Sequence, residues 1–319
     1  MKKGTRIFSI LFAAVFALLP LTGALGEELY PLPMDSTAVA PPPKDECFLS
    51  KWEYADPSIT VRIMEGAYAS IPYTAAYVKI SHPSQLRAVT ASQVRDQYLD
   101  FDLMFNSAEL AGQICAAANA VVGINGDFFT AERCKVVLRQ GKQVRNRADG
   151  DTDLLIIDKN GDFYVLGSAT RDSYANYYKG HAEELYQVYC FGPVLVRNGE
   201  SVIDEFYRNT DIIASLETQR SAICQLGPLE YLLVTSDGDS LFFTYGLTIY
   251  DFALLCERLG KQLKPETGMR LAYNLDGGNS SALVFKRRGS QGTLMYEKLN
   301  MPERERTLAD MICFVSLCQ

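Results

Sequence analysis

The residues best suited to chemistry form an acidic glycine loop near the C-terminus, Asp276-Gly277-Gly278-Asn279-Ser280-Ser281. Two adjacent glycines let backbone N–H groups approach a ligand closely and form a concavity that receives anions, and Asp276 supplies a carboxylate beside it. A turn alone rarely needs two serines as well. The pattern therefore favours a ligand site over a purely structural turn.

Four further polar groups follow or end apolar, strand-like runs. They are Asn125-Gly126-Asp127, Arg220, Asp237-Gly238-Asp239, and Asn274 just before the loop. Polar groups at strand ends collect at one rim of a sheet, where the rigid backbone positions them. Three of them have an ordinary alternative. Asp237-Gly238 is more typical of a turn, the Asn125 segment is evenly balanced between turn and site, and Arg220 alone would be read as a surface ion pair with Glu217.

Several reaction classes are excluded by what the sequence lacks. His82 and His181 are the two histidines, and neither lies near these polar groups in the sequence. The chain has no G-x-S-x-G elbow, no P-loop and no H-E-x-x-H motif. Carboxylates, asparagines, serines and one arginine remain, which suit a glycosidase or sugar-phosphate site. A divalent metal ion near Asp127, Asp237 and Asp276 is compatible with the sequence, but no spacing demands it, and we expect no required cofactor.

The charge balance excludes nucleic acid as a general partner. The chain has 38 acidic and 31 basic residues, with no long run of Lys and Arg. Such a surface repels polyanions. A phosphate on a substrate would therefore need a local positive charge in the site.

Residues 1–26 have the pattern of a secretory signal peptide. Lys2, Lys3 and Arg6 precede an apolar run over residues 7–21, and Ala24-Leu25-Gly26 forms a small-residue cleavage site. An uncleaved anchor is the alternative, but the run contains Pro20 and is shorter than the roughly 20 residues that span a bilayer. We expect a secreted or cell-surface protein with no membrane span after cleavage.

The cysteine content agrees with an oxidising compartment, where some cysteines could pair. The eight cysteines show no spacing that selects a connectivity and no zinc-type cluster. Cys256 lies among apolar residues of a predicted helix and is expected to be a buried free thiol.

The rest of the chain predicts one α+β domain over residues 58–319, preceded by a proline-rich linker or arm over residues 27–57. Residues 74–80 read as a strand, and Gln140-Gly141, Asn160-Gly161 and Asn198-Gly199 predict three hairpins. A mixed, mostly antiparallel sheet with a few packed helices follows. A regular strand–helix alternation is missing, which excludes a Rossmann or TIM fold.

Two helices and the strands beside them frame the polar groups. Residues 107–118 predict a helix with Leu110, Ile114 and Ala118 on one face, leading into a strand over residues 120–124. A second helix is predicted from a Thr248 cap, with Asp251 reaching back, to a stop at Gly260. Strands over residues 271–275 and 282–285 then flank the glycine loop.

Six stretches in order along the chain resemble the phosphodiester glycosidase family, bacterial relatives of the lysosomal enzyme that uncovers mannose 6-phosphate by removing N-acetylglucosamine from a phosphodiester. They are residues 121–129 (VVGINGDFF), 191–200 (FGPVLVRNGE), 220–223 (RSAI), 246–253 (GLTIYDFA), 274–281 (NLDGGNSS) and 306–310 (RTLAD). Asp127 stands where the family often has a second glycine, and Cys224 and Asn279 replace other common glycines.

The resemblance implies a hydrolase acting on a phosphorylated carbohydrate, with a glycan of the cell wall, capsule or exopolysaccharide as substrate. We expect Asp276 or Asp127 to face the anomeric carbon. The remaining candidates would bind substrate, with Arg220 and the N–H groups near Gly277 and Gly278 on phosphate and Asn125 and Asn274 on sugar hydroxyls. Gly126, Asp237, Ser280 and Ser281 complete the set. The alternatives are a glycan-binding protein without catalysis and a phosphodiesterase that cuts the P–O bond.

Overall fold

The structure is a computed structural model that describes residues 29–36, 38–96, 101–130, 133–207, 214–238, 245–289, 293–301 and 305–319. The predicted signal peptide and Asp239 lie outside these residues. Three sheets make up the fold, and every strand pairing that the structure describes is antiparallel. The α+β, mostly antiparallel class predicted from the sequence is confirmed.

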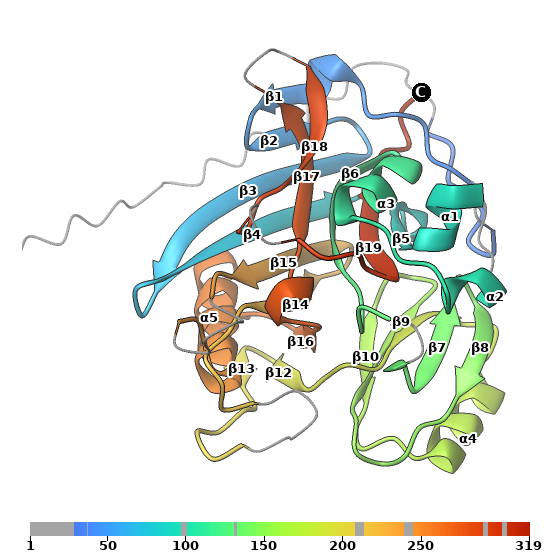
Figure 1. Cartoon of the computed structure of the whole chain (residues 1–319), viewed down its shortest axis with the longest axis vertical. Helices are drawn as coiled ribbons and strands as arrows, with labels where there is room; N and C mark the ends of the chain where they lie inside the picture. Colours follow the sequence, from blue (N-terminus) through green and yellow to red (C-terminus); the bar gives the residue numbers. More distant parts are fainter. Residues whose placement is uncertain are drawn as a thin grey trace, which may run out of the picture.

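The largest sheet has nine strands (Figure 1). One of them leads directly into the glycine loop. Its order is β1 (Phe48–Ser50), β2 (Glu53–Ala55), β3 (Ile59–Tyr68), β4 (Ile71–Ile80), β15 (Glu230–Ser236), β14 (Arg220–Gly227), β16 (Leu271–Leu275), β12 (Val194–Arg197) and β13 (Glu200–Ser201). Alternation along the strands places Tyr273 and Leu275 in one apolar core and Ala272 in another. The sheet is therefore buried on both faces around β16.

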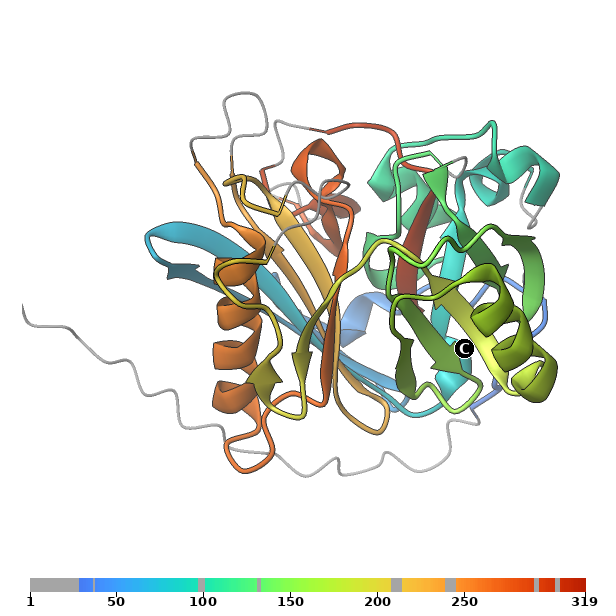
Figure 2. The same ribbon diagram turned by 90° about the horizontal axis from the view of Figure 1, so that it is seen from below.

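Helix α5 (Ile249–Leu263) covers one face of this sheet, and the two five-stranded sheets lie toward the other (Figure 2). One runs β10 (Phe163–Leu166), β9 (Leu154–Asp158), β11 (Leu185–Tyr189), β7 (Val136–Arg139), β8 (Lys142–Asn146), with α4 (Arg171–His181) beside it. The other runs β18 (Leu294–Lys298), β17 (Leu283–Arg288), β6 (Ala120–Asn125), β19 (Asp310–Val315), β5 (Leu86–Thr90), with α1 (Ala91–Asp96), α2 (Phe101–Met104) and α3 (Ala111–Ala117) around it. Short 3-10 turns occur at η1 (Asp45–Cys47), η2 (Pro83–Gln85) and η4 (Gly278–Ser280).

The three predicted hairpins are confirmed. Gly141, Gly161 and Gly199 have φ of 74°, 82° and 86°, and each connects two paired strands. The strands predicted over residues 74–80, 120–124 and 271–275 are also present, as parts of β4, β6 and β16. Turn chemistry was sufficient to find the hairpins, and strand propensity was sufficient to find residues 74–80.

The helix predicted over residues 107–118 is shorter than expected. It begins at Ala111 because the backbone of Glu109 instead exchanges two hydrogen bonds with Leu308. Leu110, predicted on the apolar face with Ile114, is 39% exposed. A long-range β-bridge thus replaces the first turn of the predicted helix.

Helix α5 starts at the predicted cap but does not end at Gly260. Thr248 Oγ1 accepts the Asp251 N–H at 3.1 Å, while the Asp251 carboxylate accepts the Thr248 hydroxyl rather than reaching back to the backbone. The helix continues to Leu263. A Cβ at Gly260 would lie 2.5 Å from Met269 Cβ, so this glycine permits close packing and is not a helix stop.

The predicted arm over residues 27–57 is more ordered than its prolines suggest. Its early part lies on the domain, where Arg87 Nη1 donates to the Pro33 carbonyl at 2.9 Å. Its later part forms β1 and β2, which extend the nine-stranded sheet, and Tyr54 is fully buried. The packed structure therefore begins before residue 58.

All eight cysteines are free thiols in this structure, and Cys256 is buried as predicted. Among the described residues, no helix combines the length and apolar character needed to cross a membrane.

Candidate active site

Asp276 follows β16 directly and connects the glycine loop to the segment after β6. Its Oδ2 accepts the Phe129 backbone N–H at 3.1 Å, and its own N–H donates to the Gly126 carbonyl at 3.4 Å. The side chain is partly exposed at this junction. Two pieces of the predicted site, far apart in the sequence, are thus brought together.

Asn125 holds this junction in place. Its Nδ2 donates to the Asp276 carbonyl at 2.8 Å, and its Oδ1 accepts the Ala282 N–H at 3.1 Å. Its side chain is buried, with both amide atoms bonded to backbone. In this conformation Asn125 positions the loop and does not face a sugar.

The environment of Asp276 raises the pKa of its carboxyl group to about 6. Burial is the main cause, and it is opposed by hydrogen bonds from the Ser280 hydroxyl and from the Phe129 and Gly277 N–H groups, and by the positive charge of Arg306. A partly exposed carboxyl group with this pKa can exchange a proton near neutral pH. Asp276 therefore has the properties of a catalytic acid or base.

Arg306 is a second charged group of this site, and it was not among the residues predicted from the sequence. Its guanidinium lies 4.2 Å from the Phe129 ring centroid, and its Nη1 donates to Ser280 Oγ at 3.3 Å. The side chain is partly exposed. Arg306 belongs to the last of the resemblance stretches, and the need for a local positive charge was the signal that could have identified it.

The two glycines of the loop pack against Gln219. A Cβ at Gly277 would lie 2.5 Å from the Gln219 carbonyl oxygen, so the loop can pass here only with glycine. The Gly278 N–H donates to that same carbonyl at 2.9 Å. Of the N–H groups near Gly277 and Gly278 that were predicted to hold phosphate, the Gly278 N–H bonds to Gln219 and the Gly277 N–H bonds to the Asp276 carboxylate.

The two serines have different environments. Ser280 contacts both Asp276 and Arg306, as described above. The Ser281 hydroxyl accepts from Ser221 at 2.8 Å and from Asn300 Nδ2 at 3.2 Å, and its side chain is fully buried. Ser280 stays in the candidate site, whereas Ser281 anchors the loop to the core.

Arg220 is a buried residue at the start of β14, not the surface ion-pair partner that its spacing from the exposed Glu217 suggested. Its Nε donates to the Leu247 carbonyl at 3.1 Å and its Nη2 to the Leu216 carbonyl at 2.7 Å. Burial lowers the pKa of Arg220 to about 10.

Asp237 and Asn274 each bond to the backbone of another segment. The Asp237 N–H donates to the Pro72 carbonyl at 2.9 Å, and the Gly238 carbonyl accepts from Gln219 Nε2 at 3.1 Å. The buried Asn274 donates through Nδ2 to the Gly192 carbonyl at 2.7 Å. Both pieces support neighbouring backbone in this structure.

Asp127 points into the core instead of toward the surface. Its Oδ1 accepts the Cys190 and Phe191 N–H groups at 2.8 and 3.1 Å, and its Oδ2 lies 3.2 Å from Arg139 Nη2. The side chain is fully buried. Burial raises the pKa of Asp127 to about 7 against the lowering effect of Arg139. This enclosure is incompatible with direct attack on a substrate, so the expected catalytic alternative to Asp276 is not available in this conformation.

Arg139 and Asp310 complete a buried ionic network that sequence reasoning missed. Arg139 Nη2 and Nε donate to Asp310 Oδ2 at 2.8 and 3.0 Å. The three charged side chains come from β7, from β19 and from the segment after β6, and no local pattern connects them. The network fixes the backbone that ends in Phe129.

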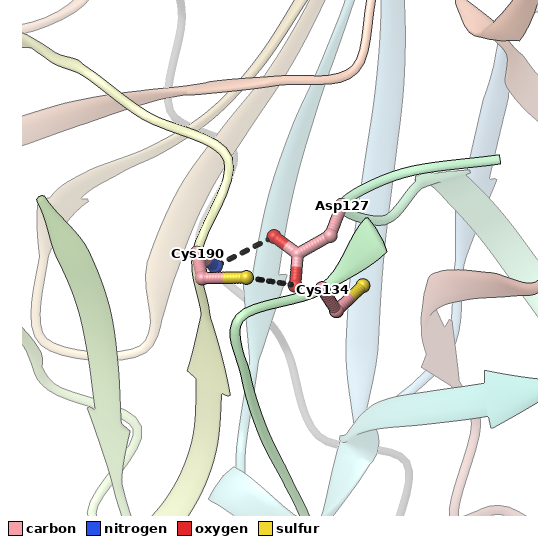
Figure 3. A group of neighbouring side chains, drawn as sticks. All are labelled: Asp127, Cys134 and Cys190. Carbon is pink, nitrogen blue, oxygen red and sulfur yellow. Dashed lines mark hydrogen bonds between the residues drawn. The ribbon is translucent and has the colours of Figure 1, made fainter. Parts of the chain in front are cut away.

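Among the described residues, one group has the composition of a metal site, and it differs from the three aspartates that the sequence was compatible with. It consists of Asp127, Cys134 and Cys190, all buried, with their ligand atoms within 4.8 Å of one another (Figure 3). Asp237 and Asp276 are not part of it.

Residues 118–315 match the phosphodiester glycosidase family. The chain belongs to this family. Every candidate residue from Asn125 to Arg306 lies within the matched range. Phosphodiester glycosidases are hydrolases, which gives the coarse class of this protein.

One solved structure supports the fold of this phosphodiester glycosidase, and a second is only a similar chain. The catalytic domain of zebrafish N-acetylglucosamine-1-phosphodiester alpha-N-acetylglucosaminidase, auto-inhibited by its pro-peptide, is 17% identical with a TM-score of 0.57, over 82% of this chain and 84% of that one. A hypothetical protein from Synechocystis is 15% identical with a TM-score of 0.48, over 81% of this chain and 62% of that one. No curated protein sequence matches.

Proposed function

We propose that this protein hydrolyses a sugar-1-phosphodiester at the anomeric C–O bond, with Asp276 as the catalytic carboxylate. The observation that supports this most is the pairing of a partly exposed carboxyl group, with its pKa raised to about 6, with the Arg306 guanidinium across Ser280. One group can take a proton near neutral pH, and the other can bind phosphate.

The leaving group explains why one carboxylate is sufficient. A phosphate monoester is already a weak base, so its departure needs little general-acid help. The ionised Asp276 accepts a proton from water as the water oxygen attacks the anomeric carbon. The C–O bond breaks, and the phosphate monoester leaves with the electron pair. This route inverts the anomeric configuration.

Arg306 is the proposed receptor for the phosphate. Stacking on Phe129 and the bond to Ser280 hold the planar guanidinium in one orientation, which reduces the entropy lost when it binds two phosphate oxygens. Arg220, buried behind the loop, supports the backbone and is a positioning residue in this scheme. Asn125 has the same role on the other side.

The family and the predicted signal peptide support a proposal for the substrate class. A protein exported from a bacterial cell meets phosphorylated glycans of the cell wall, the capsule or the exopolysaccharide. We propose one of these as the substrate and a secreted or cell-surface location for the enzyme.

Hydrolysis in oxygen-18 water tests the bond that is cut. The purified protein is incubated with a sugar-1-phosphodiester, and the label is located by mass spectrometry. Label in the sugar supports C–O cleavage. Label in the phosphate would indicate a phosphodiesterase, and saturable binding with no released sugar would indicate a glycan-binding protein.

A further inference from the structure

Cys134 and Cys190 lie beside the Asp127 carboxylate at the ends of two different segments (Figure 3). Cys134 precedes β7 and Cys190 follows β11, and these strands pair through Val188 and Leu138. Both side chains are buried, at 2% and 1% exposure. The Cys190 thiol donates to Asp127 Oδ2 at 3.8 Å.

We propose that Cys134 and Cys190 are oxidised to a disulfide in the exported protein, and that this cross-link holds the loop that places Phe129 against Asp276. The cross-link rests on the proposed export of the protein and not on the proposed reaction. Its effect on Asp276 rests on the proposed reaction as well.

The charges around the group favour a disulfide over a metal ion. The Arg139 guanidinium already lies 3.2 Å from Asp127 Oδ2, which opposes a second cation on that carboxylate. Metal binding also requires thiolates, and the neighbouring Cys190 thiol together with burial raises the pKa of Cys134. A disulfide is neutral, so it adds no buried charge beside Asp127.

The oxidation is a thiol–disulfide exchange. The Cys190 thiolate attacks a small-molecule or protein disulfide, displacing one thiolate and forming a mixed disulfide. Cys134 then attacks the Cys190 sulfur and displaces the second thiolate, so two protein thiols lose two electrons and two protons to the oxidant. Because both sulfurs are buried in the folded chain, the exchange takes place while β7 and β11 are coming together.

The cross-link would affect both sides of the Asp127 network. Cys134 closes the segment that starts at Asn125, and the next residue after Cys190 is Phe191, whose ring lies 4.8 Å from Phe128. The hydrogen bond from the Phe129 N–H lowers the pKa of Asp276. Fixing these two ends limits the motion of that N–H and so preserves the hydrogen bond. Loss of the cross-link should therefore raise the pH at which the carboxyl group ionises.

Peptide mapping of the full chain tests the cross-link directly. Protein exported by a bacterial host is prepared without reductant, alkylated with iodoacetamide under denaturing conditions and digested without reduction. We expect a disulfide-linked peptide containing Cys134 and Cys190. Complete alkylation of both cysteines would overturn the proposal, as would one equivalent of bound zinc that protects both thiols from alkylation until a chelator is added.

A matched pair of variants tests the effect. Cys134→Ser/Cys190→Ser should melt about 5 °C lower than wild type without reductant, and a reductant should shift it much less than wild type. Cys115→Ser/Cys313→Ser alters another adjacent pair, whose sulfurs lie 3.8 Å apart on α3 and β19. Reductant should still lower the melting temperature of this variant, because its Cys134–Cys190 cross-link is intact. An equal reductant shift in wild type and Cys134→Ser/Cys190→Ser would contradict the proposal. If the first variant is also active, its low-pH midpoint should rise, while that of the second should not.

Discussion

The Phe129 backbone N–H donates a hydrogen bond of 3.1 Å to Oδ2 of Asp276, joining residues 147 positions apart in the chain. The same phenylalanine presents its ring to Arg306 at 4.2 Å. One residue thus positions both the carboxyl group and the guanidinium of the proposed site. The buried Asp127, Arg139 and Asp310 network fixes the backbone on which this residue stands.

The pH dependence of activity should report the ionisation of Asp276. The carboxyl group acts as a base only when ionised, and its pKa is raised to about 6. The rate should therefore be constant above about pH 7 and fall about tenfold for each unit below pH 6. Measurement of kcat/KM against pH provides the check. A rate that stays constant down to pH 4.5 would contradict this assignment.

Asp276→Asn should raise the stability of the protein at pH 7 although it lowers the activity. A raised pKa means that the folded protein holds its proton more tightly than the unfolded chain, so ionisation of Asp276 destabilises the fold as pH rises from about 4 to 6. Removing the charge should stabilise the protein at pH 7 by about 1–3 kcal/mol and have little effect near pH 4. Urea unfolding at both pH values measures this. A destabilised variant at pH 7 would show that the carboxylate is better satisfied than we infer.

Substitution of Arg306 should weaken substrate binding. Arg306→Gln removes the proposed phosphate contact, and kcat/KM should fall by about 10- to 100-fold, with Arg306→Lys recovering part of the loss. The exposed Arg133, whose guanidinium lies 5.8 Å from the same Phe129 ring, is the matched control. Arg133→Gln should change kcat/KM by less than about threefold, and equal losses in the two Gln variants would indicate a general charge effect.

Arg139 should be essential for stability rather than for chemistry. Arg139→Met leaves Asp127 and Asp310 close together in the core without their shared cation, and it should lower the free energy of unfolding by about 3–5 kcal/mol. The exposed Arg197 at the end of β12 serves as control, and Arg197→Met should cost less than about 0.5 kcal/mol. Denaturant unfolding compares the two. Similar values for both would mean that the network contributes little.

Local patterns predicted the elements that depend on local physics. Turn glycines located the hairpins, and the Thr248 hydroxyl located the start of α5. The predicted end of α5 was wrong because Gly260 permits close packing against Met269, which is a tertiary contact, and does not stop the helix. The start of α3 was wrong for the same reason, since Glu109 pairs with Leu308.

The candidate site divides in the same way. Asp276 could be selected from its loop, because two glycines and a carboxylate stand next to one another. The burial of Asp127 could not be foreseen, because it depends on Arg139 and Asp310, which come from strands that no sequence spacing connects. The position of Arg306 could not be foreseen either, because it depends on tertiary contacts with Phe129 and Ser280.

The most direct test of the proposed catalytic role is turnover of a sugar-1-phosphodiester by wild type and by Asp276→Asn, with folding of the variant verified by circular dichroism and thermal melting. Asn keeps the shape and an acceptor for the Phe129 N–H but cannot take a proton from water. We predict that wild type releases the sugar and that Asp276→Asn loses at least about 100-fold in kcat. A folded Asp276→Asn variant that retains wild-type activity would contradict the central claim.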